Sequence, residues 1–267
     1  MTLLNHALRA ARTNAPNDHA INRPTLLAGG GGALGSAVLE ALLAARSHAT
    51  VRVLATRALG TAMPRLEPII VDDFAAAPAP DDAPLADTAL IVFDRERHAN
   101  GRELAFLRPA PEDLAALATW LRRRGVRALV VVLPHTPSQL PDALKRGLAN
   151  LDEHAVAALG FEQLVFVRSA QPPSNARATQ WLQRLADGML AQMQIMVAST
   201  NQPVRASKVA QFVAELASAL AASAAGTRVA PPELVWQAAQ MRDPAPLVQA
   251  WLAARNLPEL SAPRMRL

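Results

Sequence analysis

Short apolar runs alternate with amphipathic segments along the chain between residues 25 and 170. Runs of this kind predict buried strands, and they lie at residues 25–28, 51–56, 66–71, 88–93, 128–133 and 164–167. The fifth run is the strongest, because it continues from Leu129 to Leu133 without a polar residue, as in strands covered on both faces. The alternation of strand and helix predicts an α/β fold with a doubly wound parallel sheet and right-handed crossovers.

Apolar residues at three- and four-residue spacing predict the helices of this fold. The first, at residues 33–45, follows the first strand and presents Leu34, Val38 and Leu42 on one face. Further helices are predicted at residues 111–124, 140–159, 179–197 and 247–255 and within 203–225, with a short last strand at 227–230. A short helix at 3–12 is expected either to cap the sheet or to make a contact in a homo-oligomer.

A glycine cluster joins the first predicted strand to the first predicted helix. Gly29, Gly32 and Gly35 fit the spacing G-x-x-G-x-x-G of the dinucleotide-binding fingerprint. With Gly30 in the first position, the same segment also fits the spacing G-x-G-x-x-G. Such glycines allow a turn at positive φ, bring backbone amides close to a pyrophosphate and let the helix pack closely on the strand.

A phosphate bound by this loop would lie at the helix N-terminus, where free N–H groups and the helix dipole favour an anion. The cofactor-binding residues expected from the loop are Gly29, Gly30, Gly32, Ala33, Leu34 and Gly35. The alternative is a flexible glycine turn that binds nothing. We expect Gly32→Val or Gly35→Asp to leave the fold intact and to weaken dinucleotide binding, because either side chain obstructs the approach to the backbone.

Composition excludes several classes of function. The chain has no Cys, which excludes disulfides, thiolate catalysis and cysteine metal sites, and it has no Tyr. Its six His residues show no metal-ligand spacing, so no metal site is expected. The net charge of +5 is dispersed, so no nucleic-acid partner is expected. No apolar run approaches the ~20 residues of a membrane span, and no signal peptide is recognisable, so a cytoplasmic protein without a membrane partner is expected.

The glycine loop, a second strand that leads to Arg57 and a third that leads to Asp72 and Asp73 resemble the extended and atypical short-chain dehydrogenase/reductase superfamily. The long helix predicted after the fifth strand is also similar to that superfamily. The likeness is greatest to the epimerase-like and NmrA-like members, and it follows their order of elements over about residues 25–235. It implies an NAD(P)-binding Rossmann fold.

The resemblance divides the chain into three parts. Residues 1–24 form an N-terminal helix and linker, and residues 25–170 form the dinucleotide-binding Rossmann domain. Residues 171–267 form a small helical C-terminal extension, packed on the same domain at the substrate side. This last part contains no polar cluster that identifies a small-molecule substrate.

The end of the second strand selects the cofactor in such folds, because an acid there binds the ribose of NAD and a base binds the 2′-phosphate of NADP. Arg57 carries a permanently charged, planar guanidinium that suits a phosphate, so we expect NADP, with NAD as the alternative. The structural alternative is a solvated arginine at a strand end. Asp72 or Asp73 is expected beside the adenine, and the alternative role for either is a turn or helix cap.

Active members of the superfamily use a Tyr-x-x-x-Lys pair, in which the lysine lowers the pKa of the tyrosine for proton exchange with substrate. This chain has no tyrosine, and Lys145 stands near the tyrosine position. Thr136 or Ser138 would fill the position of the family's Ser or Thr. His135 follows the strongest strand, where open sheets bind ligands, although two flanking prolines also fit an ordinary rigid loop. The candidate catalytic residues are His135, Thr136 and Lys145.

Three functions follow from these residues. The first is an NAD(P)-binding protein of the atypical short-chain dehydrogenase type without tyrosine-based catalysis. The second is an NADPH-dependent oxidoreductase in which another residue supplies the proton. The third is a non-catalytic redox sensor or scaffold that changes its partner contacts when the dinucleotide binds.

Overall fold

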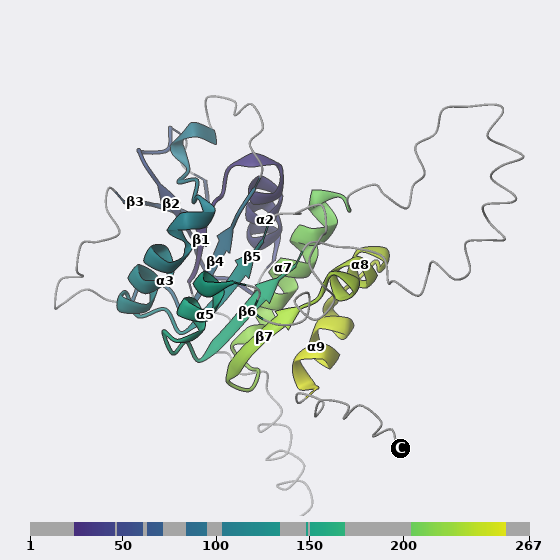
Figure 1. Ribbon diagram of the computed structural model, residues 1–267. Helices are drawn as coiled ribbons and strands as arrows, with labels where there is room; N and C mark the ends of the chain where they lie inside the picture. The colour runs from purple at the N-terminus through teal and green to yellow at the C-terminus, as the bar shows by residue number, and fades with distance from the viewer. Residues whose placement is uncertain are drawn as a thin grey trace, which may run out of the picture.

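A computed structural model of the chain describes residues 24–45, 47–60, 63–71, 84–94, 103–133, 148, 150–168 and 204–254. Within these residues, parallel strands form one seven-stranded sheet in the order β3-β2-β1-β4-β5-β6-β7 (Figure 1). The strands are β1 (Thr25–Ala28), β2 (Val51–Ala55), β3 (Leu66–Ile70), β4 (Thr88–Val92), β5 (Ala128–Val132), β6 (Gln163–Val167) and β7 (Gly226–Ala230). The chain order reverses between β1 and β4, as in a Rossmann fold. The predicted fold class is confirmed.

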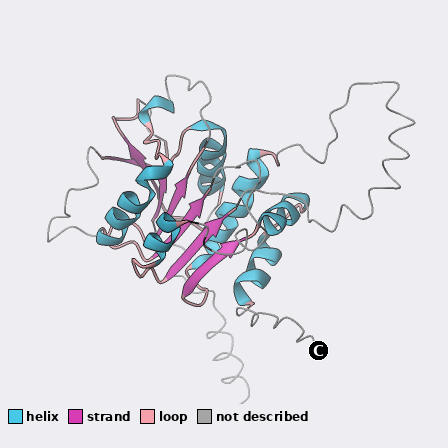
Figure 2. Cartoon of the chain, viewed as in Figure 1, coloured by secondary structure: helices cyan, strands magenta, loops and turns pink. Residues whose placement is uncertain are grey.

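Helices cover both faces of the sheet (Figure 2). One face carries α2 (Gly32–Ala44), α7 (Ala206–Leu220), α8 (Pro232–Gln240) and α9 (Ala245–Ala253), and the other carries α3 (Leu114–Arg123) and α5 (Leu151–Ala157). Successive strand residues alternate between the two layers, so that Leu27 and Val130 pack with α2 and α7. Leu26 and Leu129 pack with α3 and α5 instead. All four side chains are fully buried, and each such burial stabilises the fold by roughly 1.5–3 kcal/mol.

The position of α7 differs from that of the helices in residues 25–170, for which right-handed connections were predicted. In the chain, α3 connects β4 to β5 and α5 connects β5 to β6. These three strands lie side by side in that order in the sheet. The step from β6 to β7 continues in that direction, but α7 packs beside α2 on the opposite face. A right-handed connection would place α7 with α3 and α5. The right-handed connections predicted for residues 25–170 therefore do not extend to α7, whose buried Phe212 and Leu216 belong to the same core cluster as the buried residues of α2.

The start of α5 also differs from the predicted helix at residues 140–159. Asn150 has an extended backbone, with φ −147° and ψ 173°, and its side-chain oxygen accepts a hydrogen bond from the Glu153 amide at 2.9 Å. This N-cap begins the helix at Leu151. The C-terminal region also contains α8, for which the sequence pattern gave no prediction. Outside the described residues lie residues 140–147 and the predicted helices at 3–12 and 179–197.

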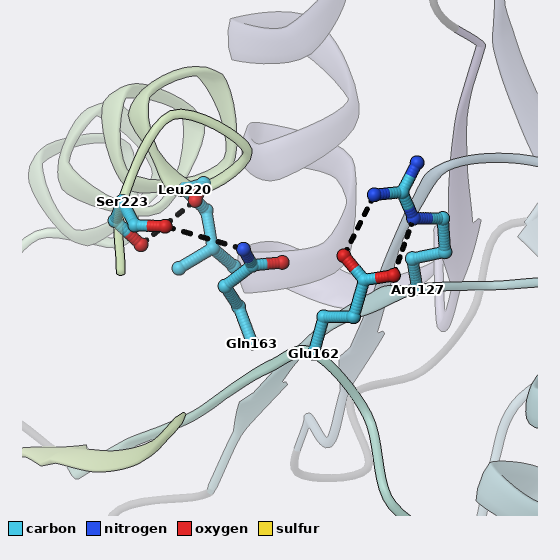
Figure 3. Close-up of polar contacts among 5 residues, drawn as sticks. All are labelled: Arg127, Glu162, Gln163, Leu220 and Ser223. Carbon is cyan, nitrogen blue, oxygen red and sulfur yellow. Dashed lines mark hydrogen bonds and ion pairs between the residues drawn. The ribbon is translucent and has the colours of Figure 1, made fainter. Parts of the chain in front are cut away.

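Polar contacts join neighbouring strands at the amino-terminal edge of the sheet. Arg127, before β5, donates to both carboxylate oxygens of Glu162, before β6, at 2.8 and 2.7 Å (Figure 3). Gln163 donates from Nε2 to the carbonyl oxygen of Ser223 at 3.3 Å, and the Ser223 hydroxyl donates to the Leu220 carbonyl at 2.8 Å (Figure 3). These bonds hold the turn between α7 and β7 against β6.

His48 is buried at the same edge, in the turn that precedes β2. Its Nδ1 lies 2.8 Å from the hydroxyl of Thr25, and its Nε2 lies 3.2 Å from the hydroxyl of Ser218 on α7. Burial, and then the positive charge of Arg65, lower the pKa of His48 from its usual 6.5 to about 4. The neutral imidazole therefore links β1, the turn before β2 and α7.

This network predicts that acid destabilises the fold. Between pH 6.5 and about pH 4, the unfolded chain binds a proton at His48 that the folded chain does not, so the free energy of unfolding falls as the pH falls. The contribution of about 3 kcal/mol is complete above pH 6.5 and is lost progressively toward pH 4. Urea unfolding at neutral pH and near pH 4 should show a smaller difference for His48→Gln than for wild type. His154→Gln, at an exposed position, is the control, and the same pH dependence in His48→Gln and wild type would disprove the role of His48.

Candidate functional site

The glycine loop lies at the carboxyl ends of β1 and β4, where the strand order reverses and where open α/β sheets bind ligands. Gly29 and Gly32 adopt positive φ values of +91° and +80°. A methyl group on Gly29 would lie 2.1 Å from the Val92 carbonyl oxygen at the end of β4. A methyl group on Gly35 would lie 2.0 Å from the Gly29 carbonyl oxygen. The loop can pass between β4 and α2 only because these residues have no side chains.

These contacts correct the expectation that glycine variants of the loop stay folded. The atoms that a Gly35 side chain would meet belong to the backbone of Gly29 and Gly30, which cannot rotate away. The Gly35→Asp variant is therefore expected to disturb the fold before it affects any ligand. Gly32 combines a positive φ with a different neighbour, because a methyl group there would lie 2.6 Å from Oδ2 of Asp94.

A carboxylate lies at the N-terminus of α2. Oδ2 of Asp94, two residues beyond β4, accepts a hydrogen bond from the Leu34 amide at 2.6 Å. The N-cap residue of α2 is Gly31, which has no side chain with which to cap the helix. Asp94 therefore supplies a cap from another part of the chain, at the positive end of the helix dipole. Sequence reasoning missed this contact, because Asp94 and Leu34 are 60 residues apart.

A second segment packs against the glycine loop at the ends of β1 and β2. It follows the turn η2 (Glu103–Ala105), and Phe106 forms an isolated antiparallel bridge with Ala55 at the end of β2. The backbone amide of Thr56 donates to Ala105, and that of Leu107 donates to Leu54, both at 2.9 Å. A methyl group on Gly30 would lie 3.4 Å from the Phe106 ring, and one on Gly29 would lie 3.4 Å from Pro109. The segment before α3 therefore packs against one side of the glycine loop.

Arg57 is exposed two residues beyond β2, on the same carboxyl edge as the glycine loop. Open α/β sheets bind ligands at this edge, and a contact between Arg57 and the adenosine ribose stays a prediction. The other candidates from the sequence, Asp72, Asp73, His135, Thr136 and Lys145, lie outside the described residues.

A buried ion pair lies at the carboxyl end of β6. Arg168, the residue after β6, donates from its two terminal nitrogens to the two carboxylate oxygens of Glu153 on α5, at 2.6 and 2.7 Å. The side chains are only 9% and 1% exposed. The pair fixes the first turn of α5 against the sheet, and sequence reasoning missed it because its partners are brought together by the fold.

The described residues contain neither a candidate metal site nor a membrane-spanning helix. Among these residues, no group of three or more His, Asp or Glu side chains is arranged to hold a metal ion. No helix in the same parts of the chain is long and apolar enough to cross a membrane.

No protein-family model and no curated protein sequence matches the chain. One similar solved structure is a Rossmann-fold NAD(P)-binding family protein from Shigella flexneri, 16% identical, with 73% of this chain and 85% of that chain covered and a TM-score of 0.39. Another is UDP-N-acetylglucosamine 4-epimerase from Bacillus cereus, 14% identical, with 83% of each chain covered and a TM-score of 0.39. A third is the Bordetella bronchiseptica enzyme WbmG in complex with NAD, 13% identical, with 88% and 96% covered and a TM-score of 0.37.

Proposed function

We propose that the chain binds a nicotinamide dinucleotide, with the pyrophosphate at the N-terminus of α2. The observation that carries this proposal is the glycine loop itself, which turns at positive φ between β1 and α2 at the reversal point of the sheet. Gly29, Gly30 and Gly32 would present the backbone of the loop to the ligand, and Ala33 and Leu34 would contribute amides of the first helical turn. The glycine loop and the first turn of α2 fit a pyrophosphate on condition that the Asp94 carboxylate moves away from the Leu34 amide.

The proposed cofactor is NADP, with NAD as the alternative. Arg57 is the basis for this choice, because it is exposed two residues beyond β2 and carries the planar charge that suits a 2′-phosphate in such folds. Asp72 or Asp73 would lie beside the adenine. A charge-assisted hydrogen bond of this kind contributes about 1.5–3 kcal/mol, or roughly a ten- to hundredfold difference in affinity.

If the protein is an enzyme, we propose an oxidoreductase that works without a tyrosine relay, since the chain has no tyrosine. A bound nicotinamide would supply or accept a hydride. His135, Thr136 and Lys145 are the proposed proton donors or substrate-orienting residues, and the substrate would be a small molecule. The second candidate function is a non-catalytic redox sensor, which the missing tyrosine favours.

Calorimetric titration with NADPH, NADH, NADP and NAD tests the binding and its specificity. NADPH is expected to bind about ten- to hundredfold more tightly than NADH, and Arg57→Ala should remove this preference. Arg127→Ala, which removes an exposed arginine at the opposite edge of the sheet, is the matched control and should retain it. Equal affinities for NADPH and NADH would contradict the choice of NADP. Absence of binding by all four nucleotides would contradict the proposed function.

A further inference from the structure

We infer that Asp94 occupies the pyrophosphate position of the glycine loop and must turn away before a dinucleotide binds, so that it sets the affinity of the site. This inference rests on the proposed function. Asp94 is not part of the glycine fingerprint. It follows β4, whereas the fingerprint follows β1. The carboxylate thus acts as an internal competitor of the ligand.

Two contacts place the Asp94 carboxylate against the glycine loop, at the N-terminus of α2. Oδ2 of Asp94 is 2.6 Å from the Leu34 amide nitrogen, one of the N–H groups at the start of α2 that would bind a phosphate oxygen. The same oxygen is 2.6 Å from the position that a methyl group on Gly32 would take. The space that the glycine leaves open toward a ligand is therefore filled by Asp94.

The carboxylate and a pyrophosphate compete for the same helix dipole and for the same hydrogen-bond donor. Each is an anion stabilised by the positive end of the α2 dipole, and each needs the Leu34 amide as a hydrogen-bond donor. A single N–H group cannot satisfy both with good geometry, and two anions in contact repel each other. Binding therefore requires Asp94 to give up its bond and move toward solvent.

The environment of Asp94 allows such a movement. Its side chain is half-buried, and among the described residues it accepts one hydrogen bond, from Leu34. Glu153 provides the contrast, because it is 1% exposed and is held by two bonds to Arg168. A carboxylate that is partly in water and held by one bond can be displaced by a ligand with more negative charge.

Asp94→Asn separates charge from shape. The amide oxygen can still accept from the Leu34 N–H group, so the cap on α2 is retained, but the negative charge is lost. The asparagine NH₂ group can in addition donate to a phosphate oxygen. Glu162→Gln is the matched control, because it removes the same charge from an exposed carboxylate at the opposite edge of the sheet.

The test is calorimetric titration of wild type, Asp94→Asn and Glu162→Gln with NADPH and, separately, with inorganic pyrophosphate. Asp94→Asn is expected to bind both probes at least about tenfold more tightly than wild type, which corresponds to about 1.4 kcal/mol. Glu162→Gln should bind them as wild type does. Circular dichroism on all three proteins establishes that the variants are folded.

The possible failures are distinct. Equal or weaker binding of NADPH by folded Asp94→Asn, with wild type still binding, would overturn the role of Asp94 and leave the proposed function intact. Absence of binding by both wild type and Asp94→Asn would contradict the proposed function, and the inference with it.

Discussion

Gly35→Ala is expected to lower the free energy of unfolding by about 3 kcal/mol or more, or to prevent folding. The added methyl carbon would lie 2.0 Å from the Gly29 carbonyl oxygen and 3.1 Å from the carbonyl carbons of Gly29 and Gly30. All of these are backbone atoms between β1 and α2, so relief requires the helix to move away from the sheet. That movement would open the contact between α2 and the core residues of β1, which are fully buried.

Gly60→Ala is the matched control for this substitution. Gly60 is exposed, has no positive φ, and has no heavy atom within 4 Å of the position of an added methyl group. Its replacement should change the free energy of unfolding by no more than about 0.5 kcal/mol. Urea unfolding of both variants, followed by circular dichroism, gives the comparison. A Gly35→Ala protein as stable as Gly60→Ala would mean that α2 does not pack on the loop as described.

Glu153→Gln is expected to lower the free energy of unfolding by about 3–5 kcal/mol. The substitution leaves the guanidinium of Arg168, 9% exposed, without the carboxylate that receives two of its hydrogen bonds. A buried charge that loses its counter-charge is costly because water cannot replace the lost partner.

The exposed pair of Arg127 and Glu162 provides the control. Its geometry is similarly bidentate, but its side chains are 52% and 44% exposed (Figure 3). Glu162→Gln should therefore cost less than about 1 kcal/mol, since solvent screens the charges and takes over the hydrogen bonds. Urea unfolding of both variants at neutral pH decides the matter. Equal losses would show that burial does not control the strength of the Glu153–Arg168 pair.

Local patterns were sufficient to predict the sheet and its loop. The apolar run at residues 128–133 became β5, and the apolar residues before the glycine cluster became β1. The spacing of Gly29, Gly32 and Gly35 marked the loop correctly, because a side chain on each of these glycines would clash with a neighbouring atom. The start of α5 was predicted wrongly at residue 140, although Asn150 followed by Glu153 is typical of a helix N-terminus.

Contacts between distant segments could not be predicted in the same way. Asp94 and Leu34 are 60 residues apart, and their hydrogen bond depends on β4 lying beside β1. The bridge between Ala55 and Phe106 likewise follows from the tertiary fold and has no periodic signature. The sequence therefore indicated where an anion could bind, but not that an acidic residue of the same chain lies there.

The most direct test of dinucleotide binding is an NMR titration of ¹⁵N-labelled protein with NADPH. The amide signals of Gly30, Gly31 and Leu34 should shift to saturation, because these N–H groups lie at the proposed pyrophosphate position. The signals of Glu162 and Gly226, at the opposite edge of the sheet, should stay in place. Unchanged signals from the glycine loop at millimolar NADPH would contradict the proposal that this loop binds a dinucleotide.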